Sequence, residues 1–139
     1  AKGRSEMPLA LSIVTPDSEA LELTCDEAAV PGINGEIGVL PGHVPLITAL
    51  RPGLITVLRE GKKTIYAVST GFAELEGEKL TVLTDHCQAA SSVDVERAKR
   101  EAAEAEKALT DMSESDPEFE VHRLRLERAQ ARITAASLK

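Results

Sequence analysis

Residues 35–50 read GEIGVLPGHVPLITAL, and this stretch decides the fold of the N-terminal part of the chain. Three glycines and two prolines interrupt residues that are otherwise mostly aliphatic. Glycine reaches positive φ or lets another backbone approach closely, whereas proline fixes φ and removes a hydrogen-bond donor. The stretch therefore excludes a helix and predicts short strands joined by a tight turn near Pro41-Gly42, with Glu36 and His43 in the loops.

The composition limits the class of protein. The chain has 139 residues, a formal net charge of −7 and only 2% aromatic residues. That length suffices for one modest domain plus an appendage. The acidic, aromatic-poor composition argues against nucleic acid as a partner, because such binding needs basic surface and stacking rings. No apolar run reaches the roughly 18 residues of a membrane-spanning helix, and no signal peptide is recognised.

The hydrophobic pattern changes near Ser91. Before this residue, apolar and polar residues alternate; after it, glycine disappears and Ala, Glu, Lys and Arg dominate. This change of period predicts strands followed by helices. We expect residues 7–90 to form a mainly β sandwich (a flattened antiparallel barrel) and residues 91–139 to form an α-helical hairpin. For residues 1–6 the sequence leaves open a cloning remnant or a native extension.

The strand-rich part shows alternation and turn signals at short intervals. Apolar residues alternate over 9–13 and 21–25, and two hairpins are predicted. One pairs residues 54–58 with 64–68, and the other pairs residues 72–75 with 80–83. Short strands at this spacing are typical of an antiparallel sandwich or barrel.

The second part predicts two helices. Ser92 is expected to cap the first, with Asp94 and Glu96 in its first turn. Asp116 is expected to cap the second, with Pro117 at its first helical position. On the first helix, Arg97–Glu101 and Arg100–Glu104 have ion-pair spacing. The apolar stripes comprise Val95, Ala98, Ala102, Ala105 and Leu109 on the first helix, and Phe119, His122, Leu126, Ala129, Ile133 and Ala136 on the second.

These stripes are thin and rich in alanine. Burying an alanine yields under about 1 kcal/mol, several times less than burying a core leucine. We therefore expect the hairpin to be stable only when docked on something larger, and to be detachable from it. The alternative is an ordinary surface hairpin that is packed permanently on the sandwich.

Neither a metal site nor catalytic chemistry is expected. Cys25 and Cys87 lack metal-ligand or CxxC spacing, which favours free, partly buried thiols in a reducing compartment over a disulfide. The three histidines at 43, 86 and 122 are scattered, and no glycine-rich phosphate loop occurs. No local Ser-His-Asp or Cys-His arrangement can be assembled either.

Four stretches together resemble the epsilon subunit of the bacterial rotary (F-type) ATP synthase. They are the opening strand with Val14-Thr15-Pro16, residues 35–50, Ser69-Thr70-Gly71-Phe72-Ala73-Glu74-Leu75, and Val93-Asp94-Val95-Glu96-Arg97-Ala98. The resemblance extends along the whole chain. It implies a non-catalytic subunit with an N-terminal β-sandwich and a C-terminal helical hairpin, in agreement with the division expected from the residue pattern.

The resemblance also implies partners and a location. The sandwich is expected to bind the gamma subunit and to rest on the ring of c subunits, with Glu36 and His43 contacting that ring. The chain would lie peripherally at the cytoplasmic face of the bacterial inner membrane, in the central rotor stalk. The hairpin would extend into the alpha/beta catalytic head and inhibit ATP hydrolysis, and Arg123, Arg125, Arg128 and Arg132 would contact acidic surface there.

A nucleotide site is a second implication. Some bacterial members bind ATP on the hairpin through the motif Ile/Leu-Asp-x-x-Arg-Ala, and residues 93–98 match it except for the shorter Val93. Together with two arginines of the second helix, this gives the candidate nucleotide-binding residues Asp94, Arg97, Arg128 and Arg132.

Two departures weigh against this site. Val121 and Glu104 stand where nucleotide-binding relatives carry arginine, and a carboxylate that faces a triphosphate repels it. The alternative is that Asp94 caps a helix and Arg97 forms an ion pair. ATP is therefore expected as a weak regulatory ligand, of millimolar affinity at best, and no other cofactor is expected. A freestanding ATP-responsive regulator and a generic scaffold are the competing functions.

Overall fold

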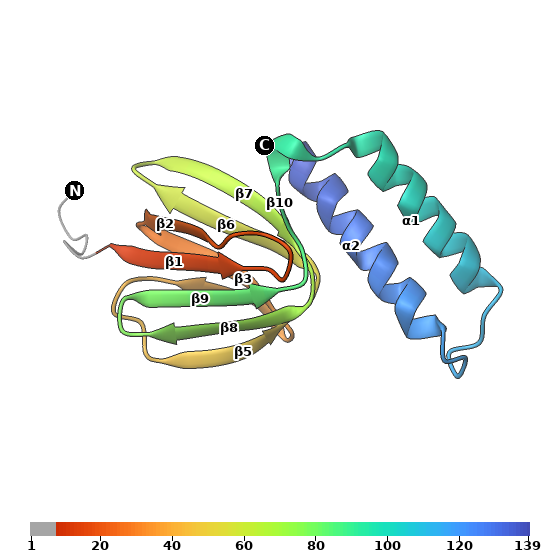
Figure 1. Ribbon diagram of the computed structural model, residues 1–139, viewed down its shortest axis with the longest axis horizontal. Coiled ribbons are helices and arrows are strands. Elements are labelled where there is room, and N and C mark those ends of the chain that lie inside the picture. Colours follow the sequence, from red (N-terminus) through yellow and green to blue (C-terminus); the bar gives the residue numbers. More distant parts are fainter. Residues whose placement is uncertain (1–7) are drawn as a thin grey trace.

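The structure, a computed structural model, describes residues 8–139 and has two parts, a β-sandwich and a helical hairpin (Figure 1). The predicted fold class is confirmed. The proposal for residues 1–6 lies outside the described residues. The strands are β1 (Leu9–Val14), β2 (Leu21–Cys25), β3 (Glu27–Gly32), β4 (Gly35–Val39), β5 (Leu46–Leu50), β6 (Gly53–Arg59), β7 (Lys62–Val68), β8 (Gly71–Glu76), β9 (Lys79–Thr84) and β10 (Cys87–Ala89). A 3₁₀ turn (Ala90–Ser92) leads to α1 (Val95–Thr110) and α2 (Phe119–Leu138).

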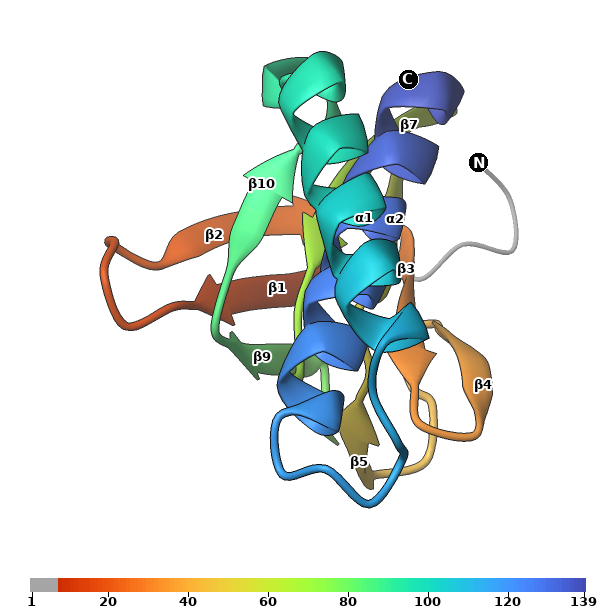
Figure 2. The ribbon, with the colours of Figure 1, turned by 90° about the vertical axis from the view of Figure 1, so that its right-hand side faces the viewer.

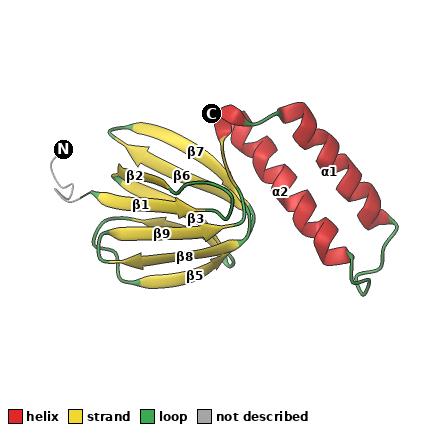
Figure 3. Cartoon of the chain, viewed as in Figure 1, coloured by secondary structure: helices red, strands yellow, loops and turns green. Residues whose placement is uncertain are grey.

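The strands form one sheet that folds over into the two layers of the sandwich (Figure 3). Its order is β10-β7-β6-β3-β5-β8-β9-β1-β2, and β4 pairs with β3. The predicted hairpins β6–β7 and β8–β9 are antiparallel, as expected from their turns. The pairing of β1 with β9 is parallel and joins the two ends of the sandwich sequence. This long-range pairing closes the sandwich.

The core lies between the two layers. Alternate residues of β1, namely Leu9, Leu11 and Ile13, point inward and are buried, together with Leu75 of β8 and Leu80 of β9. The alternation along β1 is the one that the sequence predicts. Since the inner face consists of large aliphatic residues, the sandwich has a core of its own, separate from the hairpin contacts.

Residues 35–50 form β4, a turn and β5. The turn at Pro41-Gly42 is present, and Gly42 has φ +83°, a conformation that side-chain-bearing residues rarely adopt. Glu36, expected in a loop, instead lies on β4 opposite Pro31. The preceding turn is completed at Ile33-Asn34, so the chain is already extended at Gly35.

The helix starts differ from those expected. Asp94, not Ser92, caps α1, because its carboxylate accepts a hydrogen bond from the Arg97 backbone N–H at 3.1 Å. Ser92 belongs to the 3₁₀ turn. α2 begins at Phe119, two residues after Pro117, although the Asp116 carboxylate still accepts a bond from the Glu118 N–H at 2.9 Å.

Helix α2 lies between α1 and the sandwich (Figure 2). The alanines of the α1 stripe, Ala98, Ala102 and Ala105, are buried as predicted. The sequence did not predict a second apolar face on α2, where Ala131 and Ala135 pack with Ile65 and Ala67 of β7. An ion pair between Arg51 Nη2 and Glu127 Oε1, at 3.3 Å, also joins sandwich and hairpin. The hairpin therefore contributes small side chains to this contact, which pack against Ile65 of the sandwich.

Candidate functional site

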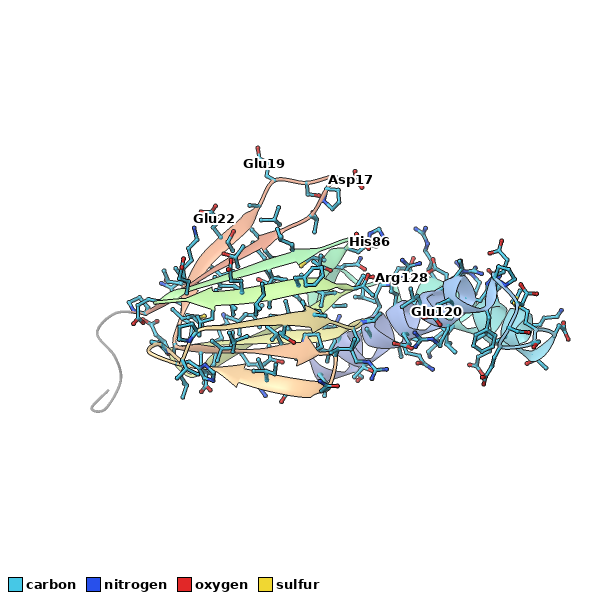
Figure 4. All side chains as sticks on the ribbon, turned by 90° about the horizontal axis from the view of Figure 1, so that it is seen from below. Asp17, Glu19, Glu22, His86, Glu120 and Arg128 are labelled. Carbon is cyan, nitrogen blue, oxygen red and sulfur yellow. The ribbon has the colours of Figure 1, made fainter. Side chains whose placement is uncertain are left out.

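A cavity of about 510 Å³ lies where the hairpin meets the sandwich. The loop after β1, the end of β7, the segment 85–88 and both helices form its walls. Figure 4 labels His86 of the sandwich and Arg128 of α2 on its two sides. Because both parts of the chain contribute to the lining, the cavity exists only while the hairpin is docked.

All four candidate nucleotide-binding residues, Asp94, Arg97, Arg128 and Arg132, line this cavity. Asp94 is brought there as the N-cap of α1, and Arg97 follows one turn later. Arg128 and Arg132 are one turn apart on α2. The structure therefore brings together residues that the sequence placed on two separate helices.

Most of the positive charge in the cavity is already neutralised by glutamates. Glu101 accepts hydrogen bonds from Arg97 Nε, at 3.2 Å, and from Arg132 Nη2 of the other helix. Arg125 Nη2 bonds Glu104 Oε1 at 2.6 Å. Within residues 8–139, Arg128 is the lining arginine without an ion-pair partner. The unoccupied anion-binding capacity of the cavity is therefore small.

Two expectations about this region need correction. Glu101, rather than Glu104, is the acidic residue of α1 that lines the cavity, and Glu104 pairs with Arg125 of α2. The expected pair Arg100–Glu104 is thereby replaced by an interhelical pair. The expected Arg97–Glu101 pair is present. Val121 is 54% exposed on α2 and does not line the cavity.

The arginines expected to reach the catalytic head are all occupied in the docked hairpin or face the cavity. Arg123 bonds Glu120 and Glu127, and these bonds raise the pKa of its guanidinium above the ordinary value. Arg125, Arg128 and Arg132 line the cavity. Contact with another surface would require Arg123, Arg125 and Arg132 to leave their present partners, whereas within residues 8–139 Arg128 has no ion-pair partner to leave.

The residues expected at the c ring lie elsewhere on the sandwich. Glu36 is exposed, and His43 is half-buried in the turn after β4, with Nδ1 2.8 Å from the carbonyl oxygen of Val44. Glu36 lies on β4 and His43 lies four residues after the end of this strand, which pairs with β3 alone among the described strands. Leu40 and Val44, in the same turn, are also exposed.

An apolar surface on the outer face of β5, β8 and β9 was missed from the sequence. Its exposed side chains are Ile47, Phe72 and Leu83, of which Phe72 and Leu83 are cross-strand partners. A groove of about 630 Å³ lies beside Phe72 and Leu83. The alternation of β8, with Ala73 and Leu75 inward, already places Phe72 outward, so the signal was present. Adjacent exposed apolar residues of this kind form a candidate interaction surface.

Family models match both parts of the chain. The β-sandwich domain of the ATP synthase delta/epsilon chain matches residues 8–90, and the long α-helix domain of the same chain matches residues 91–137. The chain belongs to the ATP synthase delta/epsilon family. Among its relatives are the ATP synthase epsilon chains of Myxococcus xanthus, 40% identical over 93% of this chain and 95% of the relative, and of Anaeromyxobacter sp. strain Fw109-5, 40% identical over 94% and 98%.

Solved structures share the fold of this family member. A chain in the cryo-EM structure of the Euglena gracilis mitochondrial ATP synthase superposes with a TM-score of 0.80 and 24% identity, covering 100% of this chain and 86% of that one. A chain of the Tetrahymena thermophila central stalk and c ring superposes at 0.62 with 8% identity, covering 93% and 96%. The similarity includes the hairpin as well as the sandwich.

Membership of the epsilon family confirms the prediction of a non-catalytic subunit. Residues 8–139 hold no cluster of His, Cys, Asp and Glu suited to a metal ion. Both cysteines are free, and burial raises the pKa of the Cys25 and Cys87 thiols. The described helices include none with the length and hydropathy needed to cross a bilayer.

Proposed function

We propose that this chain is the rotor-stalk subunit that couples the catalytic head of a proton-translocating ATP synthase to its c ring. In this role it lies peripherally at the cytoplasmic face of the bacterial plasma membrane. Family membership supports the proposal, as does the similarity to a chain of a structure described as central stalk and c ring. The apolar surface of Ile47, Phe72 and Leu83 is suited to the gamma subunit, because it would otherwise stay in water.

The hairpin acts as a brake on ATP hydrolysis in this proposal. The observation that carries it is the docking contact itself, in which α2 meets β7 through Ala131 and Ala135. Alanine burial contributes under about 1 kcal/mol per residue, so the α2 side of the contact adds little apolar free energy, and the main large side chain that undocking uncovers is Ile65 of β7. The half-exposed Arg51 adds at most about 1 kcal/mol through its pair with Glu127. A hairpin that undocks and opens presents four arginines to acidic surface on the catalytic head, after Arg123, Arg125 and Arg132 leave their glutamates within the hairpin.

Co-purification tests the coupling role, and Glu36→Lys tests the contact with the c ring. We expect the chain to co-purify with gamma and c subunits, and the variant to lower c-subunit recovery and proton pumping while leaving the thermal midpoint unchanged. The reason is that Glu36 is exposed, where a charge pair is worth about 0–1 kcal/mol to the fold.

Glu22→Lys is the matched control, because Glu22 is also an exposed strand glutamate but lies on β2. Equal recovery of c subunits with Glu36→Lys and Glu22→Lys would contradict the contact at Glu36.

A second candidate function is that of an ATP-responsive sensor, and the interhelical cavity favours it. Asp94, Arg97, Arg128 and Arg132 line one cavity that exists only in the docked state. A ligand bound there would stabilise the docked hairpin by RT ln(1 + [L]/Kd). ATP would then hold the brake away from the catalytic head.

Thermal unfolding of the isolated chain with Mg-ATP tests the sensor. Since Glu101 already binds two of the four arginines that line the cavity, we expect a millimolar Kd. At several millimolar Mg-ATP the midpoint should rise by about 2–4 °C. Arg128→Ala should abolish the rise, because Arg128 is the lining arginine left without a partner among residues 8–139. No rise, or an equal rise in Arg128→Ala, would count against ATP as the ligand.

A further inference from the structure

Glu101 stands out among the residues that line the interhelical cavity. Its carboxylate accepts a hydrogen bond from Arg97 of its own helix through Oε1, and one from Arg132 of α2 through Oε2. Each carboxylate oxygen is therefore occupied by a different guanidinium. The side chain is only 27% exposed, and that of Arg132 only 24%, so this bridge is partly shielded from water.

The Glu101 carboxylate bridges two arginines of different helices, and an anionic ligand bound in the cavity would make the same bridge. Two guanidinium groups from different helices converge on one carboxylate, as they would on a phosphate, because both anions accept charge-assisted hydrogen bonds from arginine. A phosphate that entered the cavity would meet the negative charge of Glu101. It would also find Arg97 and Arg132 already bonded.

We propose that Glu101 is an internal counter-ion that takes the place of an anionic ligand between α1 and α2. It closes the hairpin without a ligand, and it lowers the affinity of the cavity for polyphosphate by competing for Arg97 and Arg132. The inference rests on the proposed sensor function, since it names the residue that sets how strongly that site responds. Closure of α1 on α2 is then largely independent of nucleotide in this chain.

The test compares Glu101→Gln with Glu106→Gln in the full chain. Both substitutions remove one negative charge from α1 and keep the side-chain shape, but Glu106 is exposed and does not line the cavity. Calorimetric titration with Mg-ATP and with inorganic tripolyphosphate measures affinity. Amide hydrogen exchange of residues 95–110 without ligand measures how often the hairpin opens.

Two opposite effects are expected from Glu101→Gln. Exchange in the ligand-free chain should become about two- to fivefold faster, because a partly exposed bridge is lost. The Kd for Mg-ATP and for tripolyphosphate should fall by about tenfold or more, because two guanidinium groups are released. Glu106→Gln should leave both quantities near those of the unaltered chain.

The inference is overturned if Glu101→Gln binds these anions no more tightly than Glu106→Gln, or if the two variants exchange at the same rate. The sensor function is judged separately, by whether the unaltered chain binds Mg-ATP and loses binding on Arg128→Ala. A chain that binds no nucleotide until Glu101 is changed would refute the sensor and support the counter-ion.

Discussion

A chain that ends after Ser92 is expected to inhibit the soluble catalytic head less than the full chain, so that ATP hydrolysis rises by about three- to tenfold. The extended hairpin would present Arg123, Arg125, Arg128 and Arg132 to acidic surface, where several charge pairs act together. The net gain is limited, because three of the four are paired: Arg123, Arg125 and Arg132 must first leave Glu120, Glu127, Glu104 and Glu101. Removing the hairpin removes every contact between these arginines and the catalytic head.

The truncation is interpretable because the sandwich keeps its own core. The large buried residues of β1, β8 and β9 belong to a cluster without hairpin members. Gamma binding by the truncated chain should therefore equal that of the full chain, and this serves as the control. If the truncated chain binds gamma and inhibits hydrolysis as strongly as the full chain, the hairpin is not the brake.

Gly71→Ala should lower the free energy of unfolding by at least about 3 kcal/mol. A Cβ at position 71 would lie 1.8 Å from the carbonyl oxygen of Leu83, in the strand paired with β8. Neither group can rotate away, since the obstruction is backbone rather than a flexible side chain. The β8–β9 pair would have to separate locally, beside the fully buried Ala73.

Gly38→Ala is the matched control for this prediction. Gly38 also lies in a strand, but a Cβ there would meet nothing within 4 Å, and its φ is not positive. We expect a change within about 0.5 kcal/mol. Urea unfolding of both variants gives the comparison, and similar midpoints would show that β8 and β9 can move apart without cost.

Local signals in the sequence predicted much of the sandwich. The alternation of Leu9, Leu11 and Ile13 identified the inner face of β1, and Pro41-Gly42 identified the turn after β4. The parallel pairing of β1 with β9 was not predicted, because strand partners far apart in sequence leave no local pattern. Glu36 was wrongly placed in a loop, because the glycines around it suggested a turn. Glycine also allows extended backbone, and that is the conformation of β4.

The site was predicted only in part, and the reason is geometric. The candidate nucleotide residues were identified through the family motif, but their ion pairs depend on how the two helices face one another. The link from Glu101 to Arg132 spans that interface, so helical spacing within one helix cannot reveal it. The second face of α2 escaped notice because Ala131 and Ala135 differ little from the alanines around them.

The alanine lining of the docked hairpin also determines how its equilibrium responds to temperature. Heat capacity changes in proportion to the apolar area that enters water, and the cluster around Ala131 and Ala135 has fewer buried residues than the sandwich core. The free energy of undocking should therefore curve much less with temperature than the free energy of unfolding the sandwich. The stabilisation from ion pairs such as Arg51–Glu127 is maintained better on warming, because the desolvation penalty of charged groups falls as temperature rises. The docked and undocked populations of the hairpin should therefore follow a nearly linear van't Hoff plot, unlike those of the folding sandwich.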